Sequence, residues 1–187
     1  MATQRTENPG PGLWLGLVGD FRVYRDGVPV HGPKVGSLKA RTLLTLLAVR
    51  WAQLVPLELV VEAVWGGQAP RQPGENVATL VSRVRAVLGS EVIEGSRIGG
   101  YRLGEGVRVD LAEAAAFVGQ AEAYLSGGQP GAAVAAAVRG LGLLDGAVLG
   151  GEEAEWARPA RVLHAQLLRR ARRAHAEAAP RAVADHP

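Results

Sequence analysis

Apolar and polar residues alternate from residue 13 to residue 31, in the stretch LWLGLVGDFRVYRDGVPVH. Such alternation is typical of short strands that bury one face. Asp26 and Gly27 stand between two alternating runs, and this dipeptide favours the positive φ angles of a tight hairpin turn. The pattern therefore predicts two or three short antiparallel strands.

Helical spacing replaces the alternation in the next 40 residues. In SLKARTLLTLLAVRWAQ, Ser37 can accept hydrogen bonds at a helix N-terminus. A second helix, LELVVEAVWG, is expected to begin after Pro56 and end at Gly66-Gly67, followed by a loop over residues 66–74. The apolar positions expected to face the core are Leu38, Leu43, Leu44, Leu47 and Trp51 in the first helix, and Leu59, Val60, Ala63 and Val64 in the second.

A third helix is predicted from Asn76 to Gly89, NVATLVSRVRAVLG. At about 100° per residue its apolar positions form one narrow stripe. The stripe consists of Val77, Val81, Val84 and Leu88. The opposite face carries Glu75, Thr79, Ser82, Arg83 and Ala86. Asn76 and Arg85 lie on the flanks between the two. This polar face fits either an ordinary solvated surface or the recognition helix of a DNA-binding domain.

The stretch EVIEGSRIGGYRL after this helix predicts a β-hairpin with its turn around Gly95–Arg97 and a return strand through Tyr101 and Leu103. The order of strands, three helices and a hairpin is that of a winged helix. In this context the third helix is better interpreted as a recognition helix. The first predicted fold is therefore an α+β winged helix-turn-helix with N-terminal strands and a C-terminal wing.

Only helical patterns follow Val109-Asp110. Gly127-Gly128 is expected to end one Ala-rich helix and Pro130 to open the next, which is typical of a tetratricopeptide-like hairpin. A third long helix is expected over residues 152–179, with His164 at the edge of its packed face. We predict a flexible leader (1–12), a winged-helix domain (13–109) and an all-α tetratricopeptide-like domain (110–187).

Charge and composition agree with a cytoplasmic DNA-binding protein. The chain has no cysteine, so disulfides and thiol chemistry are excluded. Residues 1–109 hold 13 Arg and Lys against 9 Asp and Glu, a net charge of +4, whereas residues 110–187 have 8 against 9. The first part is thus the better candidate for a polyanionic partner. No apolar stretch predicts a membrane span or a signal peptide.

Several side chains have the chemistry needed to contact DNA. Arg83 can donate two parallel hydrogen bonds to guanine, Asn76 can pair with adenine, and Thr79 offers thymine a methyl group. Ser82 and Ala86 are small enough for close approach to a groove wall. At the wing, Arg97 suits phosphate or a narrow minor groove, and Arg102 lies near the base. Lys34, Lys39 and Arg41 are candidates for backbone phosphate, with a solvated helix start as the alternative.

Enzymatic motifs are missing from the sequence. The four histidines, at 31, 164, 175 and 186, have no metal-ligand spacing, and no phosphate-binding loop, GxGxxG or GxSxG occurs. We expect no catalytic residues, metal or cofactor. The run Arg169, Arg170, Arg172 and Arg173 surrounds a helix instead of forming one face, so solvation or pairing with acidic neighbours is expected.

The segments AVWG, NVATLVSRVRAVLG and GGYRL, with SLKARTLLTLLAV before them, resemble the Streptomyces antibiotic regulatory protein (SARP) family. The resemblance extends from about Leu13 to about Ala179. It implies an OmpR-type winged helix joined to a bacterial transcriptional activation domain of tetratricopeptide-like helices. The implied function is activation of a biosynthetic gene cluster, with binding to direct repeats of double-stranded DNA as a homodimer and contact with RNA polymerase holoenzyme.

By the same resemblance, the helix 76–88 enters the major groove and the hairpin the minor groove. Thr79, Arg83, Arg85 and Arg97 become contact residues, and the loop 66–74 faces the polymerase. The sequence departs from the family in two respects. The helical domain is expected to be incomplete, leaving Val162, Leu163, Leu167 and Leu168 partly exposed, and Leu80 takes an outward flank of the recognition helix.

Two alternatives to independent DNA binding stay open at this point. The chain could be a protein-interaction module that uses the winged helix as a scaffold. It could also be the sensing end of a larger multidomain regulator.

Overall fold

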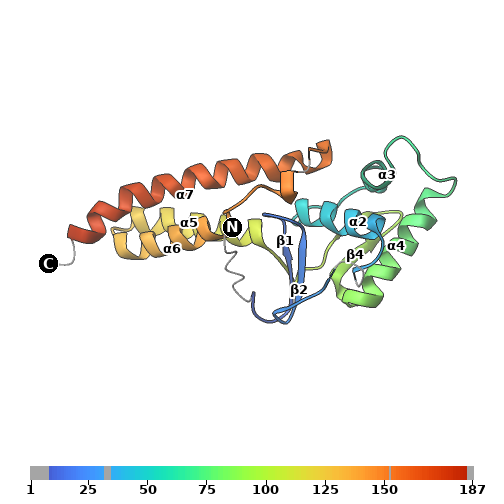
Figure 1. Cartoon of the computed structure of the whole chain (residues 1–187), viewed down its shortest axis with the longest axis horizontal. Coiled ribbons are helices and arrows are strands. Elements are labelled where there is room, and N and C mark those ends of the chain that lie inside the picture. Colours follow the sequence, from blue (N-terminus) through green and yellow to red (C-terminus); the bar gives the residue numbers. More distant parts are fainter. Residues whose placement is uncertain (1–8, 32–34, 152, 185–187) are drawn as a thin grey trace. The chain divides into compact units, whose positions relative to one another are not determined.

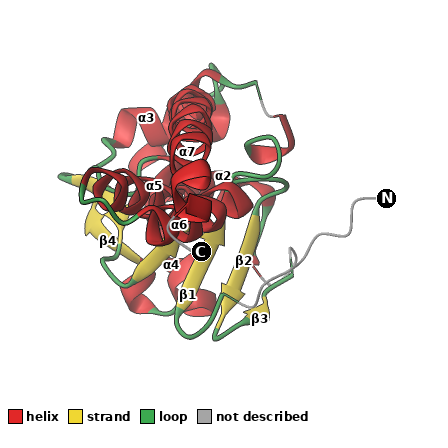
Figure 2. Ribbon diagram, turned by 90° about the vertical axis from the view of Figure 1, so that its left-hand side faces the viewer, coloured by secondary structure: helices red, strands yellow, loops and turns green. Residues whose placement is uncertain are grey.

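The computed structural model describes residues 9–31, 35–151 and 153–184. The N-terminal strands are β1 (Leu13–Gly16), β2 (Arg22–Arg25) and β3 (Val28–Pro29), and they form a four-stranded sheet with β6 (Val107–Val109) in the order β3-β2-β1-β6. The predicted turn is confirmed: Asp26 and Gly27 have φ angles of 51° and 76°, and Arg25 pairs with Val28 across it. Figure 2 shows β1, β2 and β3 side by side.

Three helices follow the sheet: α2 (Leu38–Val49), α3 (Leu57–Trp65) and α4 (Pro73–Leu88). Ser37 caps α2 as predicted, because its Oγ accepts a hydrogen bond from the N–H of Ala40 at 3.3 Å. The expectation that Leu38 faces the core is wrong, since 78% of it is exposed at the first turn. On α3 only Val60 of the expected stripe is fully buried.

A short 3₁₀ turn, η1 (Ser90–Val92), leads into the hairpin of β4 (Ile93–Ser96) and β5 (Gly100–Leu103). Val55, in the chain between α2 and α3, pairs with Tyr101 through N–H···O bonds of 2.7 and 2.9 Å. These elements confirm the predicted winged helix. They belong to one compact unit, which comprises the described residues 9–15, 22–31 and 35–108.

The second unit comprises the described residues 16–21, 109–151 and 153–184. Its helices are α5 (Asp110–Ser126), α6 (Pro130–Leu143) and α7 (Arg158–Ala184), with 3₁₀ turns η2 (Leu149–Gly151) and η3 (Glu155–Ala157) before α7. The helices lie alongside one another in Figure 1. The expected end of the last helix near residue 179 is wrong, because α7 continues through Pro180 to Ala184.

Small residues allow these helices to pack closely. Ala121 of α5, Ala136 and Ala137 of α6, and Ala174 of α7 form one buried cluster. A Cβ added at Gly140 would lie only 3.3 Å from the side chain of Val118. The all-α, tetratricopeptide-like fold predicted from the Ala-rich pattern is confirmed.

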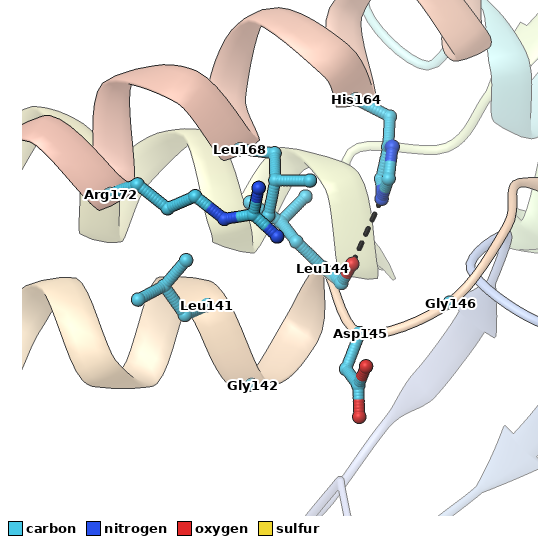
Figure 3. Close-up of a pocket in the computed structure, with 8 residues that line it drawn as sticks. All are labelled: Leu141, Gly142, Leu144, Asp145, Gly146, His164, Leu168 and Arg172. Atoms are coloured by element: carbon cyan, nitrogen blue, oxygen red, sulfur yellow. Dashed lines mark hydrogen bonds between the residues drawn. The ribbon is translucent and has the colours of Figure 1, made fainter.

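The expected exposure of α7 is partly wrong. Leu167 is 1% exposed and Leu163 and Leu168 are half-buried, because this face packs on α5 and α6. Val162 is 48% exposed. His164 lies at the edge of the packed face as predicted, with its Nε2 2.9 Å from the carbonyl oxygen of Leu144, beside a cavity of roughly 370 Å³ (Figure 3).

The start of α5 is held by a buried carboxylate. Asp110 is 1% exposed, and its Oδ2 accepts hydrogen bonds of 2.8 Å from the backbone N–H groups of Leu17 and Val18. Residues 17–19 also pair with residues 147–150 through backbone bonds, including Leu149 N–H to the oxygen of Leu17 at 2.7 Å. The domain limits expected from the sequence placed residues 16–21 with the winged helix, whereas their contacts place them with α5–α7.

We expect Asp110→Ala to lower the free energy of unfolding by about 2–4 kcal/mol, because it removes the acceptor of three buried N–H groups, those of Leu17, Val18 and Leu111. Urea denaturation followed by circular dichroism measures the change. Asp145→Ala, at an exposed position, is the control and should stay close to wild type. Equal stability of the two variants would contradict this role for Asp110.

An ion pair joins α5 to α7. Arg170 donates to both carboxylate oxygens of Glu122, at 2.9 and 2.6 Å. These hydrogen bonds hold the pKa of Glu122 below its ordinary value of 4.5. A carboxyl whose folded pKa is lowered stabilises the fold above its unfolded pKa, and that contribution is lost as the pH falls through the folded pKa.

Stability should therefore decline as the pH falls below about 4.5, and Glu122→Gln should flatten part of this decline. Melting temperatures measured between pH 3 and 6, roughly one and a half units on either side of 4.5, test this prediction. Arg170→Gln should flatten the curve in the same way, because it removes the partner. An unchanged slope in both variants would contradict the assignment.

Candidate nucleic-acid interface

Helix α4 buries one side and exposes the other. Val77, Val81, Val84 and Leu88 are each at most 1% exposed, so the predicted apolar stripe is the buried side. Leu80 is 6% exposed, which corrects its expected outward position and widens the buried face. The exposed residues of the helix include the predicted polar set, Glu75, Thr79, Ser82, Arg83 and Ala86.

The helix begins earlier than predicted. Pro73 is the first residue of α4, so residues 73 and 74 are helical and not part of the loop, and the helix begins three residues before Asn76. Proline suits this place, because the first N–H groups of a helix have no intrahelical partner. The amide nitrogen of Asn76 donates to the carbonyl of Gln72 at 2.8 Å, which leaves its Oδ1 as an acceptor. Asn76 is exposed.

Thr79 and Arg83 differ in their freedom to contact a ligand. The hydroxyl of Thr79 donates to the carbonyl of Glu75 at 2.9 Å, so toward an outside group it can only accept. Its methyl group stays available for apolar contact. Arg83 is exposed, and within the described part of the chain its guanidinium has no hydrogen-bond or ion-pair partner. Its five donors are therefore available to a partner outside the chain.

Arg85 points along the domain surface to the hairpin. Its Nε and Nη2 donate to the carbonyl of Ile93 at 3.0 and 2.7 Å, and Nη2 lies 3.5 Å from the carbonyl of Gly95. The predicted contact residue thus ties α4 to β4. These donors are engaged within the domain, and direct DNA contact by Arg85 stays a prediction.

The wing turn falls two residues later than predicted. β4 and β5 pair from Ile93–Leu103 to Ser96–Gly100, so the turn comprises Arg97, Ile98 and Gly99. The shift follows from Gly100, whose φ of +90° and approach to Val55 fit it to the first position of β5. Arg97 remains at the exposed tip, as expected.

The tip lies next to the start of α4. A Cβ added at Gly74 would be 3.8 Å from Cδ of Arg97 and 4.0 Å from its Cβ. The stem of Arg97 therefore lies beside the first turn of the helix. In Figure 1, β4 lies beside α4.

Arg102 is already paired with acidic side chains. Its Nε and Nη2 donate to one oxygen of Glu94 at 2.9 and 2.7 Å, and Glu105 lies 4.0 Å away. The hydrogen bond and charge of Arg102 lower the pKa of Glu94 and the pairing raises the pKa of Arg102. The positive charge at the wing base is thereby compensated, so Arg102 contributes less to attraction of an anion than Arg97.

The start of α2 carries further cations. The ammonium group of Lys39 lies 5.2 Å from the ring centre of Trp65, within cation–π range. Arg41 is half-buried. Lys34, predicted as a third phosphate contact, lies outside the described residues.

Sequence reasoning missed two features of the interface. Arg25 of β2 donates a hydrogen bond from Nη2 to the carbonyl of Leu88, at the end of α4. Ile98 is 93% exposed at the wing tip. Neither follows from periodicity: Arg25 stands 63 residues from its partner, and Ile98 resembles an ordinary strand residue in sequence.

Two absences hold for the part of the chain that the structure describes. Its histidine and acidic side chains form no group of three or more placed to hold a metal ion. None of its helices is long and apolar enough to span a membrane.

The elements and their order define the class: a winged helix followed by a helical domain. No protein-family model matches the chain. It is 35% identical over 159 residues to regulatory protein AfsR of Streptomyces coelicolor, covering 83% of this chain and 16% of AfsR. Similarity to regulatory protein AfsR of Streptomyces griseus is 31% over 134 residues, or 71% of this chain and 13% of that protein.

A solved structure shares the fold. The chain of Mycobacterium tuberculosis EmbR in complex with a low-affinity phosphopeptide matches with a TM-score of 0.76 and 23% identity, covering 92% of this chain and 47% of that one. The similarities confirm the resemblance seen in the sequence: the chain is a homologue of the AfsR regulatory proteins of the SARP family. It spans only 16% and 13% of the length of those AfsR proteins.

The geometry of the wing can be tested at Gly100. An added Cβ would lie 2.6 Å from the backbone oxygen of Val55, at a φ of +90° that L side chains rarely adopt. We expect Gly100→Ala to cost about 2 kcal/mol or more in unfolding free energy and to speed amide exchange in β5. Gly106→Ala, where nothing lies within 4 Å, is the control. Slow exchange in Gly100→Ala would refute the close approach.

Proposed function

We propose that the chain is a cytoplasmic, sequence-specific DNA-binding transcriptional regulator that activates a biosynthetic gene cluster. α4 reads bases in the major groove, and the wing contacts the adjacent minor groove. The observation that carries the proposal is the polar face of α4, where Thr79, Ser82 and Arg83 are exposed and Arg83 has no partner among the described residues, with Arg97 of the wing tip beside the first turn of the same helix. The relationship to AfsR supports a regulatory role.

The chemistry of this face fits base edges. Arg83 can reach O6 and N7 of guanine with two donors, and the Thr79 methyl can contact the methyl group of thymine. Ser82 and Ala86 are small and exposed, so the helix axis can approach the groove closely. Lys39, Arg41 and Arg97 supply phosphate contacts that fix the register, in keeping with the net charge of +4 over residues 1–109.

A second surface of the winged helix is suited to a protein partner. A depression of roughly 400 Å³ lies between α3 and the loop after it, lined by apolar side chains and by Glu58 and Glu62. We propose that this surface contacts RNA polymerase holoenzyme. The lining residues include Leu57, Val61, Ala69 and Pro73.

Binding to direct repeats implies at least two copies on DNA. We propose that the chain binds such repeats as a homodimer formed on the DNA, with α5–α7 as the activation domain.

Arg83→Ala should weaken binding to a selected DNA duplex by roughly 1–3 kcal/mol and relax specificity at one position, because a bidentate contact to guanine is lost. Electrophoretic mobility shift with duplexes mutated base by base measures both effects. Arg181→Ala, an exposed arginine of α7, is the control. If Arg83→Ala and Arg97→Ala each bound DNA with wild-type affinity, the groove assignment would be refuted.

Salt titration separates this proposal from a protein-interaction module. The affinity of a DNA reader falls steeply as salt rises, because each neutralised phosphate releases counterions. DNA binding that is flat with salt, or absent at any salt, favours an interaction module in which the winged helix is a scaffold.

A further inference from the structure

Ile98 is an apolar side chain at the tip of a basic hairpin. It is 93% exposed, more than Leu38, Val183 or Val28 at 78%, 76% and 64%. It stands between Arg97 and Gly99 in the turn, where its side chain contributes little to the core. Burial of this side chain can stabilise only a complex with another molecule.

The turn that presents Ile98 is held on both sides. Ser96 pairs with Gly100 directly below it, and the N–H of Gly99 lies 3.4 Å from Oγ of Ser96. Tyr101, 2% exposed, is bonded to Val55 in both directions, which adds a third backbone segment to the hairpin. A preorganised tip loses little conformational entropy when it binds.

The surroundings of the tip favour DNA as the partner. Arg97 lies against the first turn of α4, so a duplex contacted by the exposed face of α4 meets the tip as well. The turn itself carries one positive and no negative side chain. A cation next to an exposed apolar residue is the combination that minor-groove binding proteins use: the cation follows the negative potential and the apolar residue contacts the groove interior.

We propose that Ile98 enters the minor groove and makes this contact selective for A·T over G·C pairs. The minor groove of a G·C pair presents the amino group of guanine, a donor that A·T pairs lack. An isoleucine side chain offers this donor no acceptor and displaces the water that would solvate it. The inference rests on the proposed DNA-binding function and assigns a base preference to the wing.

The test uses a duplex obtained by in vitro selection with the full 187-residue chain. One A·T pair under the wing, located by footprinting, is replaced by G·C and separately by inosine·cytosine, which lacks the minor-groove amino group. We expect G·C to weaken wild-type binding about five- to tenfold, the scale of one unfavourable base pair. Inosine·cytosine should restore the affinity.

Three variants separate Ile98 from its neighbours. Ile98→Ala should bind the three duplexes within about twofold of one another, since little of the apolar side chain remains to exclude the amino group. Arg97→Ala should bind all three more weakly but keep the preference. Val28→Ala, at the exposed turn of the other hairpin, should behave as wild type.

Two results would overturn the assignment: Ile98→Ala keeping the full preference with wild-type affinity, or keeping it while binding all three duplexes more weakly by the same factor. The second result would indicate a nonselective contact or a protein partner at the tip. Absence of wild-type binding to any selected duplex would instead contradict the proposed function itself. Equal melting temperatures of the variants show that the comparison concerns binding and not folding.

Discussion

The helical unit depends on the burial of one carboxylate. Asp110 begins α5, and its two oxygens accept the N–H groups of Leu17, Val18 and Leu111. Leu17 and Val18 each precede Asp110 by more than 90 residues in the sequence. The negative charge also lies at the positive end of the helix dipole. Through this group, a segment that follows the first strand of the winged helix becomes part of the helical unit, so neither unit is a continuous piece of chain.

The fold could be predicted from sequence wherever periodicity determines it. The stripe from Val77 to Leu88 and the Asp26-Gly27 turn were both predicted correctly, because each depends on local spacing or on local φ angles. The burial of Leu80 and the exposure of Leu38 were not predicted correctly. A helical wheel gives the direction of each side chain, but it does not show how far neighbouring elements extend around the helix. The wing turn was misplaced because the close contact of Gly100 with Val55 joins residues far apart in sequence.

The candidate site was predictable in location and less so in detail. Sequence alone indicates which face of α4 is polar, and the exposed Thr79, Ser82 and Arg83 lie there. It does not show that Arg85 bonds to carbonyls of β4 or that Arg102 is paired with Glu94, since both depend on how the hairpin returns along the helix. For α7, exposure was overestimated because its alanines and Leu167 form a packing face despite the many arginines around it.

The bonds from Arg85 to Ile93 and Gly95 have a consequence for the geometry of the proposed complex. They fasten α4 to the hairpin, so these two parts have a fixed separation. In the proposed complex with DNA, the base pairs contacted by α4 and those contacted by the hairpin would therefore be separated by a constant fraction of a helical turn, whatever their sequence.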